Sequence, residues 1–181
     1  MTSVQVTTWY LQQTEPAQPA SAPEPDPDLE IRRAELPSPE LCRALYAGVG
    51  SDWYWIDRLG WTWEQWYAYL DRDELEVWVP WLRGTPAGYV ELSIESDAVE
   101  IASFGLLPAF VGRGLGKRLL DFAVRRAWEL GPARVWLHTC SLDSPAALPN
   151  YRARGFEVYN EVMASMELPP RPEPWPGANR P

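Results

Sequence analysis

The chain contains few of the residues from which metal sites and disulfide frameworks are built. Its 181 residues include two cysteines, Cys42 and Cys140, and one histidine, His138, and their spacing matches no metal-ligand motif. Two cysteines are too few for the disulfide scaffold of a small secreted domain. We therefore expect a cytoplasmic protein that binds no metal.

Long apolar runs and a surplus of basic residues are also missing. No run approaches the ~20 apolar residues of a membrane-spanning helix, and the first residues lack a basic segment followed by an apolar one. Sixteen basic residues against 25 acidic ones give a net charge of −9, which opposes binding to nucleic acid or to an anionic membrane. We expect neither partner.

Proline and the acidic residues divide the chain into four parts. Residues 14–28 and the Pro-rich residues 169–181 cannot bury enough apolar surface to fold alone, so we predict a mobile linker and a disordered tail. Residues 29–168 are long enough for one domain with its own core. Residues 1–13 alternate as a strand does. This strand could join the edge of its own sheet, join that of a second subunit in a homodimer, or be a frayed end.

The main domain has the patterns of an α/β fold. Its periodicity predicts strands at 29–33, 75–82, 88–94, 99–107, 134–139 and 157–167, and helices at 39–47, 62–70, 115–130 and 144–154. Ser38 and Thr62 are the expected N-caps of the first two helices. Short turns separate the second, third and fourth of these strands, which is typical of an antiparallel meander.

Three alternating glycines form the most informative stretch. Gly112, Gly114 and Gly116 connect the strand that ends at 107 to the helix predicted over 115–130. Glycines let backbone N–H groups turn toward one point, and a helix N-terminus adds unpaired donors and the positive end of its dipole. The junction therefore predicts a phosphate-binding site.

Spacing separates the phosphate loops that these glycines could form. A Walker-type loop requires glycine where Val111 stands and Ser or Thr where Arg118 stands, so it is excluded. A dinucleotide fingerprint requires the third glycine one residue later than Gly116, which makes this alternative weak. The remaining alternative is a turn that only lets strand and helix pack closely.

The chain resembles the GNAT superfamily of acyl-CoA-dependent N-acyltransferases from about residue 29 to residue 167. The family's phosphate motif, Gln or Arg followed by two residues, Gly, one residue and Gly or Ala, falls on residues 111–116. Its second signature, Asn-x-x-Ala-x-x-x-Tyr-x-x-x-Gly-Phe, falls on residues 144–156, with Tyr151 at the tyrosine. Val111 and Ser144 depart from the two motifs. Pro149 should kink the last helix or delay its start.

The resemblance implies a mixed, mostly antiparallel sheet with helices on both faces. It also implies transfer of an acetyl group from acetyl-CoA to a primary amine of a small molecule or peptide, by direct attack in a ternary complex. The alternative is a non-catalytic acyl-CoA sensor or a protein-interaction module on the same fold. The residues expected to bind the cofactor are Leu106, Leu107, Val111, Gly112, Arg113, Gly114, Leu115, Gly116, Lys117 and Ser144.

Direct attack requires a base, because an alkylammonium with a pKa near ~10.4 cannot attack a thioester. Glu100 precedes the glycine junction at a position where some family members carry a catalytic Glu. Strand alternation predicts that it shares a face with Ala102 and Phe104, where burial would raise its pKa. Glu91 and His138 are further candidates for the base. Glu91 could instead be a solvated carboxylate, and His138 could be a histidine packed in the sheet.

The leaving thiolate requires a proton donor. In many relatives this donor is the phenol of a tyrosine, and Tyr151 falls at that tyrosine's position. Its hydroxyl is protonated at pH 7, and its alternative role is to cover the core. The sequence does not identify the acceptor. An aromatic-rich region, which could form an acceptor pocket or belong to the core, comprises Trp53, Tyr54, Trp55, Trp61, Trp63, Trp66 and Tyr67.

Overall fold

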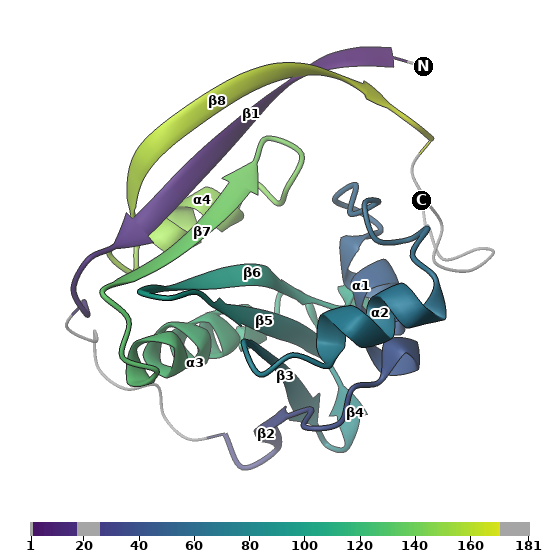
Figure 1. Cartoon of the computed structure of the whole chain (residues 1–181), viewed down its shortest axis with the longest axis vertical. Helices are drawn as coiled ribbons and strands as arrows, with labels where there is room; N and C mark the ends of the chain where they lie inside the picture. The colour runs from purple at the N-terminus through teal and green to yellow at the C-terminus, as the bar shows by residue number, and fades with distance from the viewer. Residues whose placement is uncertain (1, 18–25, 171–181) are drawn as a thin grey trace.

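All strands in the described part of the chain, residues 2–17 and 26–170 of a computed structural model, belong to one sheet (Figure 1). The order is β2-β3-β5-β6-β7-β1-β8, with the short β4 beside β3. The strands are β1 (Thr2–Gln13), β2 (Leu29–Arg33), β3 (Leu75–Leu82), β4 (Thr85–Pro86), β5 (Gly88–Ile94), β6 (Ala98–Leu106), β7 (Arg134–Cys140) and β8 (Glu157–Leu168). The helices are α1 (Pro39–Gly50), α2 (Trp63–Leu70), α3 (Leu115–Glu129) and α4 (Ala147–Arg152).

Only β6 and β7 are parallel, and the other neighbouring strands pair antiparallel. This arrangement confirms the expected mixed, mostly antiparallel sheet. Most of the predicted linker, residues 18–25, and of the predicted tail, residues 171–181, lies outside the described residues.

Helices begin where capping residues allow them to. Ser38 accepts a hydrogen bond from a first-turn N–H of α1, and Thr62 forms a capping box with Gln65 at the start of α2. The last helix begins at Ala147 and not at 144, which confirms the delay expected from proline. Pro149 lies in the first turn of α4, where its missing N–H removes no intrahelical hydrogen bond.

Each face of the sheet buries its own core. Alternation along β5 places Val90 and Leu92 in a cluster with α3, and Tyr89 in a second cluster with α1 and α2. We call these sides the α3 face and the α1–α2 face. The face on which a candidate residue lies determines the side from which it reaches the site.

The N-terminal strand lies inside the sheet. β1 pairs antiparallel with β7 on one side and with β8 on the other, so of the three alternatives the strand joins its own sheet, inside it and not at its edge. Buried Gln13 at its end accepts a hydrogen bond from Trp128 Nε1 at 2.8 Å and donates to the carbonyl of Arg154. These contacts fix the end of β1 to α3 and to the segment after α4.

Beyond β7 the first residues of β1 form a two-stranded ribbon with β8 (Figure 1). Residues 161–167 of β8 are all exposed, and no described strand pairs with the outer edge of β8. Three apolar side chains on it remain largely in water, at Val162, Met163 and Met166. An isolated two-stranded ribbon is marginally stable, so the stability of this ribbon depends on the end at which β1 also pairs with β7.

Candidate active site

The sheet opens between its two parallel strands. The ladder joins Ala98, Val99 and Glu100 of β6 to β7, and beyond these pairs the strands diverge (Figure 1). β6 stays paired with β5 on its other side up to Leu106. Backbone groups of β6 that point away from β5 therefore face an opening, where amide groups of a ligand can pair with them.

At the end of β6 only one of the two predicted leucines has free backbone groups. Leu107 N–H donates to Ala87 O at 2.9 Å, and Leu107 O accepts from Phe110 N–H at 2.9 Å. Because successive residues of a strand point their backbone groups to opposite sides, those of Leu106 face the opening. Leu106 is thus the better placed of the two to pair with a ligand.

The glycine junction closes one end of this opening. Gly112 and Gly114 have φ values of 82° and 78°, a left-handed conformation that favours glycine. Gly114 is the N-cap of α3 and supplies no capping side chain. A Cβ added at either glycine would contact nothing within 4 Å. The space beside these two glycines is therefore open, and the first N–H groups of α3, which have no partner within the helix, are the donors that an anion could use.

The side chains around this junction differ in their exposure. Val111 and Arg113 are exposed, and the Arg113 guanidinium lies 5.7 Å from the centre of the Phe110 ring. Leu115 is buried in the core, so only its backbone can face a ligand. Gly116 sits against β6, where an added Cβ would lie 3.7 Å from Leu106 Cδ1, and Lys117 lies on the first turn of α3.

A network of polar contacts holds α4 on the far side of the opening. Arg154 donates to Asp121 Oδ1 at 2.7 Å and to Lys117 O at 3.1 Å, joining the end of α4 to the start of α3. Asp143 accepts hydrogen bonds from Thr139 and from the backbone of Cys140 in the turn after β7. Ser144 Oγ accepts from Ala146 N–H within the same turn.

Tyr151 projects from α4 into the core beside the opening. It is 7% exposed, and its ring lies 6.4 Å from Phe104 and 6.3 Å from Phe156, both nearly edge-on. Burial, and then the Asp143 carboxylate, raise the pKa of its phenol. The phenol therefore stays protonated, and none of the hydrogen bonds among the described residues uses its hydroxyl.

Glu100 and His138 form a pair across the parallel ladder. Glu100 Oε1 lies 3.4 Å from His138 Nδ1, with the Glu100 side chain 17% exposed and that of His138 47% exposed. The hydrogen bond to Glu100 raises the pKa of His138, against a smaller opposing effect of burial. The structure brings these two candidates together.

The predicted face of Glu100 is wrong. β6 pairs Glu100 with Ser93 and Phe104 with Val90, and the register shifts between them by one residue, opposite Glu91 and Leu92. This β-bulge interrupts the alternation, so Glu100 lies on the α1–α2 face and Phe104 on the α3 face. The bulge thus puts Glu100 and Tyr151 on opposite faces of the opening.

The His138–Glu100 pair should give the fold a pH-dependent stability. The folded pKa of His138 is raised, so the pair stabilises the fold below the unfolded pKa of ~6.5 and loses this contribution as the pH rises through the folded pKa. We expect His138→Gln to lower the free energy of unfolding more at about pH 5.5 than at about pH 9. Urea unfolding at both pH values measures this, and an equal loss at both would contradict it.

Glu91 is completely buried and its carboxylate is occupied. Its oxygens accept hydrogen bonds from Arg58 at 2.8 and 3.1 Å, from Tyr69 at 2.9 Å and from Ser103 at 3.0 Å. The Arg58 guanidinium also lies 4.2 Å from the centre of the Tyr69 ring. This geometry favours a role in holding the loop before α2 over one in accepting a proton from an incoming amine.

Three of the seven aromatic residues in the aromatic-rich region belong to the α1–α2 core. Trp66 is 1% exposed, and Trp55 and Trp61 pack against the same cluster. Trp63 is exposed and stacks on Tyr67 with ring centres 5.0 Å apart. This distribution favours the structural interpretation of these residues.

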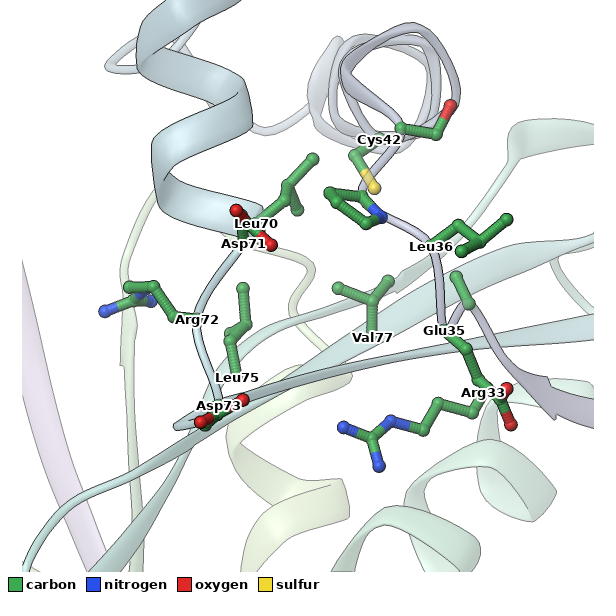
Figure 2. Close-up of a pocket in the computed structure, with 13 residues that line it drawn as sticks. Arg33, Glu35, Leu36, Cys42, Leu70, Asp71, Arg72, Asp73, Leu75 and Val77 are labelled. Atoms are coloured by element: carbon green, nitrogen blue, oxygen red, sulfur yellow. The ribbon is translucent and has the colours of Figure 1, made fainter.

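A separate pocket of about 160 Å³ lies between the start of α1, the end of α2 and β3 (Figure 2). Arg33, Asp71 and Asp73 are among its lining residues, and none of the candidate site residues lines it. Cys42 also lines it, and burial followed by the Glu91 carboxylate raises the pKa of its thiol to about 12. A thiol with such a pKa is a poor nucleophile, so Cys42 gives the pocket no reactive thiolate.

Within the described residues no group of three or more His, Cys, Asp or Glu side chains could hold a metal ion. None of the helices described is long and apolar enough to cross a membrane.

The fold thus places two parallel strands that separate beside a glycine-bounded helix start. The sequence profile of the acetyltransferase (GNAT) family matches residues 30–156, and the chain belongs to this family. The match excludes β1 and β8. These two strands therefore lie outside the segment by which the family is defined.

Solved structures show the same fold. A GCN5-related N-acetyltransferase from Sphaerobacter thermophilus has a TM-score of 0.66 and 21% identity, covering 93% of this chain and 53% of that one. One from Kribbella flavida has a TM-score of 0.61 and 20% identity, covering 88% and 57%. The aminoglycoside N-acetyltransferase AAC(6')-Iy, solved in complex with CoA, has a TM-score of 0.54 and 19% identity, covering 77% and 94%. This chain thus spans little more than half the length of the first two.

Proposed function

We propose that this protein transfers an acetyl group from acetyl-CoA to a primary amine by direct attack in a ternary complex. The glycine junction carries the proposal, because its open N–H donors lie at the end of a strand whose partner has separated from it. An N-terminal helix dipole and unpaired amides suit a diphosphate. Membership of the acetyltransferase (GNAT) family, whose profile matches residues 30–156, supports the same function.

The chain's own residues would hold acetyl-CoA mainly through the backbone. The N–H groups of residues 112–116 bind the diphosphate, and the Arg113 and Lys117 side chains add positive charge beside it. Leu106 pairs with the amides of the pantetheine arm, and Leu107 lines it. Val111 contributes no polar side chain, and Ser144 closes the far wall. Acetyl-CoA supplies the thioester carbonyl that the amine attacks.

The acid and the base act from opposite faces of the opening. Glu100, on the α1–α2 face, accepts a proton from the amine, and His138 beside it orients the carboxylate. The amine nitrogen then bonds to the acetyl carbon as the carbon–sulfur bond breaks, and the second proton that this nitrogen loses on becoming an amide passes to solvent. Tyr151, on the other face, donates its proton to the departing thiolate. Solvent exchange restores both groups.

Removing the Tyr151 hydroxyl should lower kcat by on the order of 10²-fold or more if it is the acid. Tyr151→Phe keeps the ring between Phe104 and Phe156, so the affinity for acetyl-CoA should change little. Steady-state kinetics of thiol release measures both quantities, with Tyr67→Phe on α2 as a matched control. Unimpaired turnover would remove Tyr151 from the mechanism.

A non-catalytic acyl-CoA sensor is the alternative function. It is supported by Val111 and Ser144, which differ from the residues that the two family motifs have at these positions. Following free thiol release from acetyl-CoA with a panel of amines distinguishes the two, since a sensor would be stabilised by acyl-CoA without releasing thiol. Release with any amine supports the transferase.

The acceptor could be a small molecule or a peptide, because the fold serves both. Solved structures with this fold include aminoglycoside acetyltransferases and the ribosomal-protein-S18-alanine N-acetyltransferase from Escherichia coli. A cytoplasmic location without nucleic-acid or membrane partners stays a proposal. A homodimer also stays a proposal. β1 is already paired on both sides, so the edge that could pair with a second subunit is the open edge of β8.

A further inference from the structure

A strand outside the family match lies beside the candidate base. Tyr10 of β1 pairs directly with His138 of β7, and their ring centres are 5.9 Å apart. His138 in turn contacts Glu100 at 3.4 Å. Tyr10, which lies outside the matched segment, is therefore separated from the proposed base Glu100 by His138 alone.

Four rings follow one another from this point across three strands. Trp136 lies 6.4 Å from His138, His138 lies 5.9 Å from Tyr10, and Tyr10 lies 6.3 Å from Tyr159 of β8. We call Trp136, His138, Tyr10 and Tyr159 the aromatic strip. It occupies the same face as Glu100, since Glu100, Trp136 and His138 are joined by the parallel ladder and by alternation along β7.

Two rings of the aromatic strip, His138 and Tyr159, are open to solvent, and the other two, Tyr10 and Trp136, are half-buried. The α1–α2 core is built on β3 and β5, so these helices leave β7, β1 and β8 uncovered on this face (Figure 1). The His138 side chain is 47% exposed and Tyr159 is 44% exposed. Partly exposed rings beside the proposed base are a natural place for the non-reacting part of a substrate.

The charges along the strip select among amines. Glu100 provides a negative charge beside His138, and the Arg134 guanidinium lies 5.6 Å from the Tyr159 ring centre and 5.9 Å from that of Trp136. Arg134 already occupies these ring faces and would repel a second cation. An acceptor with several positive charges is thus disfavoured, whereas one with a single amine can place it at Glu100.

Resting on the proposed function, we propose that the aromatic strip binds the acceptor, and that the acceptor is a primary monoamine joined by a short chain to a flat aromatic ring. The amine reaches Glu100, and the ring lies against Tyr10 and His138. Offset or edge-to-face contacts between such rings favour binding beyond the area that they bury. Tyr10 is then a specificity-determining residue for the reaction.

The test compares 2-phenylethylamine, hexylamine and spermidine as acceptors. Wild-type protein should have the highest kcat/KM for 2-phenylethylamine and the lowest for spermidine. Tyr10→Val keeps a strand-forming residue and should raise the KM for 2-phenylethylamine by about 2- to 10-fold, the effect of losing one ring contact. The KM for hexylamine and for acetyl-CoA should change little. Gln5→Val, on the opposite face of the same strand, is the matched control.

Two outcomes would overturn the proposal. One is a kcat/KM for spermidine that equals or exceeds that for 2-phenylethylamine, and the other is an unchanged KM for 2-phenylethylamine in folded Tyr10→Val. Tyr10→Phe retains the ring and should restore binding. If no amine releases thiol, the proposed function fails, and calorimetry of 2-phenylethylamine with wild type and Tyr10→Val still tests the strip: saturable binding that the variant weakens supports it, and no saturation overturns it.

Discussion

Replacing Glu100 by glutamine should lower kcat for acetyl transfer by about 10²- to 10⁴-fold. The variant keeps the shape of the side chain and can still hydrogen-bond to His138, so the fold should be preserved. It cannot accept a proton, however, and the acceptor then stays an ammonium that has no lone pair with which to attack. The KM for acetyl-CoA should not change, because residues 112–116 are untouched.

The pH dependence makes this prediction specific to a base. As the pH approaches the amine pKa of ~10.4, more acceptor is free of its proton, and the ratio of wild-type to variant kcat should fall. Glu95→Gln, an exposed carboxylate in the turn between β5 and β6, is the matched control and should behave as wild type. A kcat within about twofold of wild type, or a ratio that does not change with pH, would exclude Glu100 as the base.

Replacing Glu91 by alanine should lower the free energy of unfolding by about 3–5 kcal/mol. The change leaves the Arg58 guanidinium without its carboxylate at a site where the arginine side chain is only 17% exposed. Tyr69 and Ser103 lose their acceptor in the same step. Because a domain is stable by only about 5–15 kcal/mol in total, this loss should be plain in urea unfolding.

An exposed ion pair provides the control for this prediction. Arg83 contacts Asp28 at 2.8 Å, but their side chains are 78% and 47% exposed. Arg83→Ala should therefore cost no more than about 1 kcal/mol. A loss below that value for Glu91→Ala, with an unchanged urea dependence, would show that the buried network does not hold the loop before α2.

Local patterns predicted the elements because each depends on residues close in sequence. The caps at Ser38 and Thr62 act on the turn that follows them, and the glycines at 112 and 114 were identifiable because only glycine favours the conformation found there. The family motifs are local in the same sense. This is why the fold could be predicted, and a phosphate site proposed, from local sequence.

What the sequence could not supply depends on contacts between distant segments. The bulge in β6 leaves no mark in the alternation of its own residues, and it decides the face on which Glu100 lies. Arg58 and Glu91 are 33 residues apart, so nothing near Glu91 showed that its charge was already paired. The place of β1 followed from its partners β7 and β8, and the contact of Tyr10 with His138 appears only once that register is known.

The central claim is that main-chain donors beginning near residue 112 hold the diphosphate of coenzyme A. Calorimetry of the folded protein with acetyl-CoA and with acetyl-pantetheine, which lacks the diphosphate, tests it most directly. We predict saturable binding of acetyl-CoA and no saturation with acetyl-pantetheine at the same concentrations. Equal binding of the two, or no saturable heat with acetyl-CoA, would contradict the account.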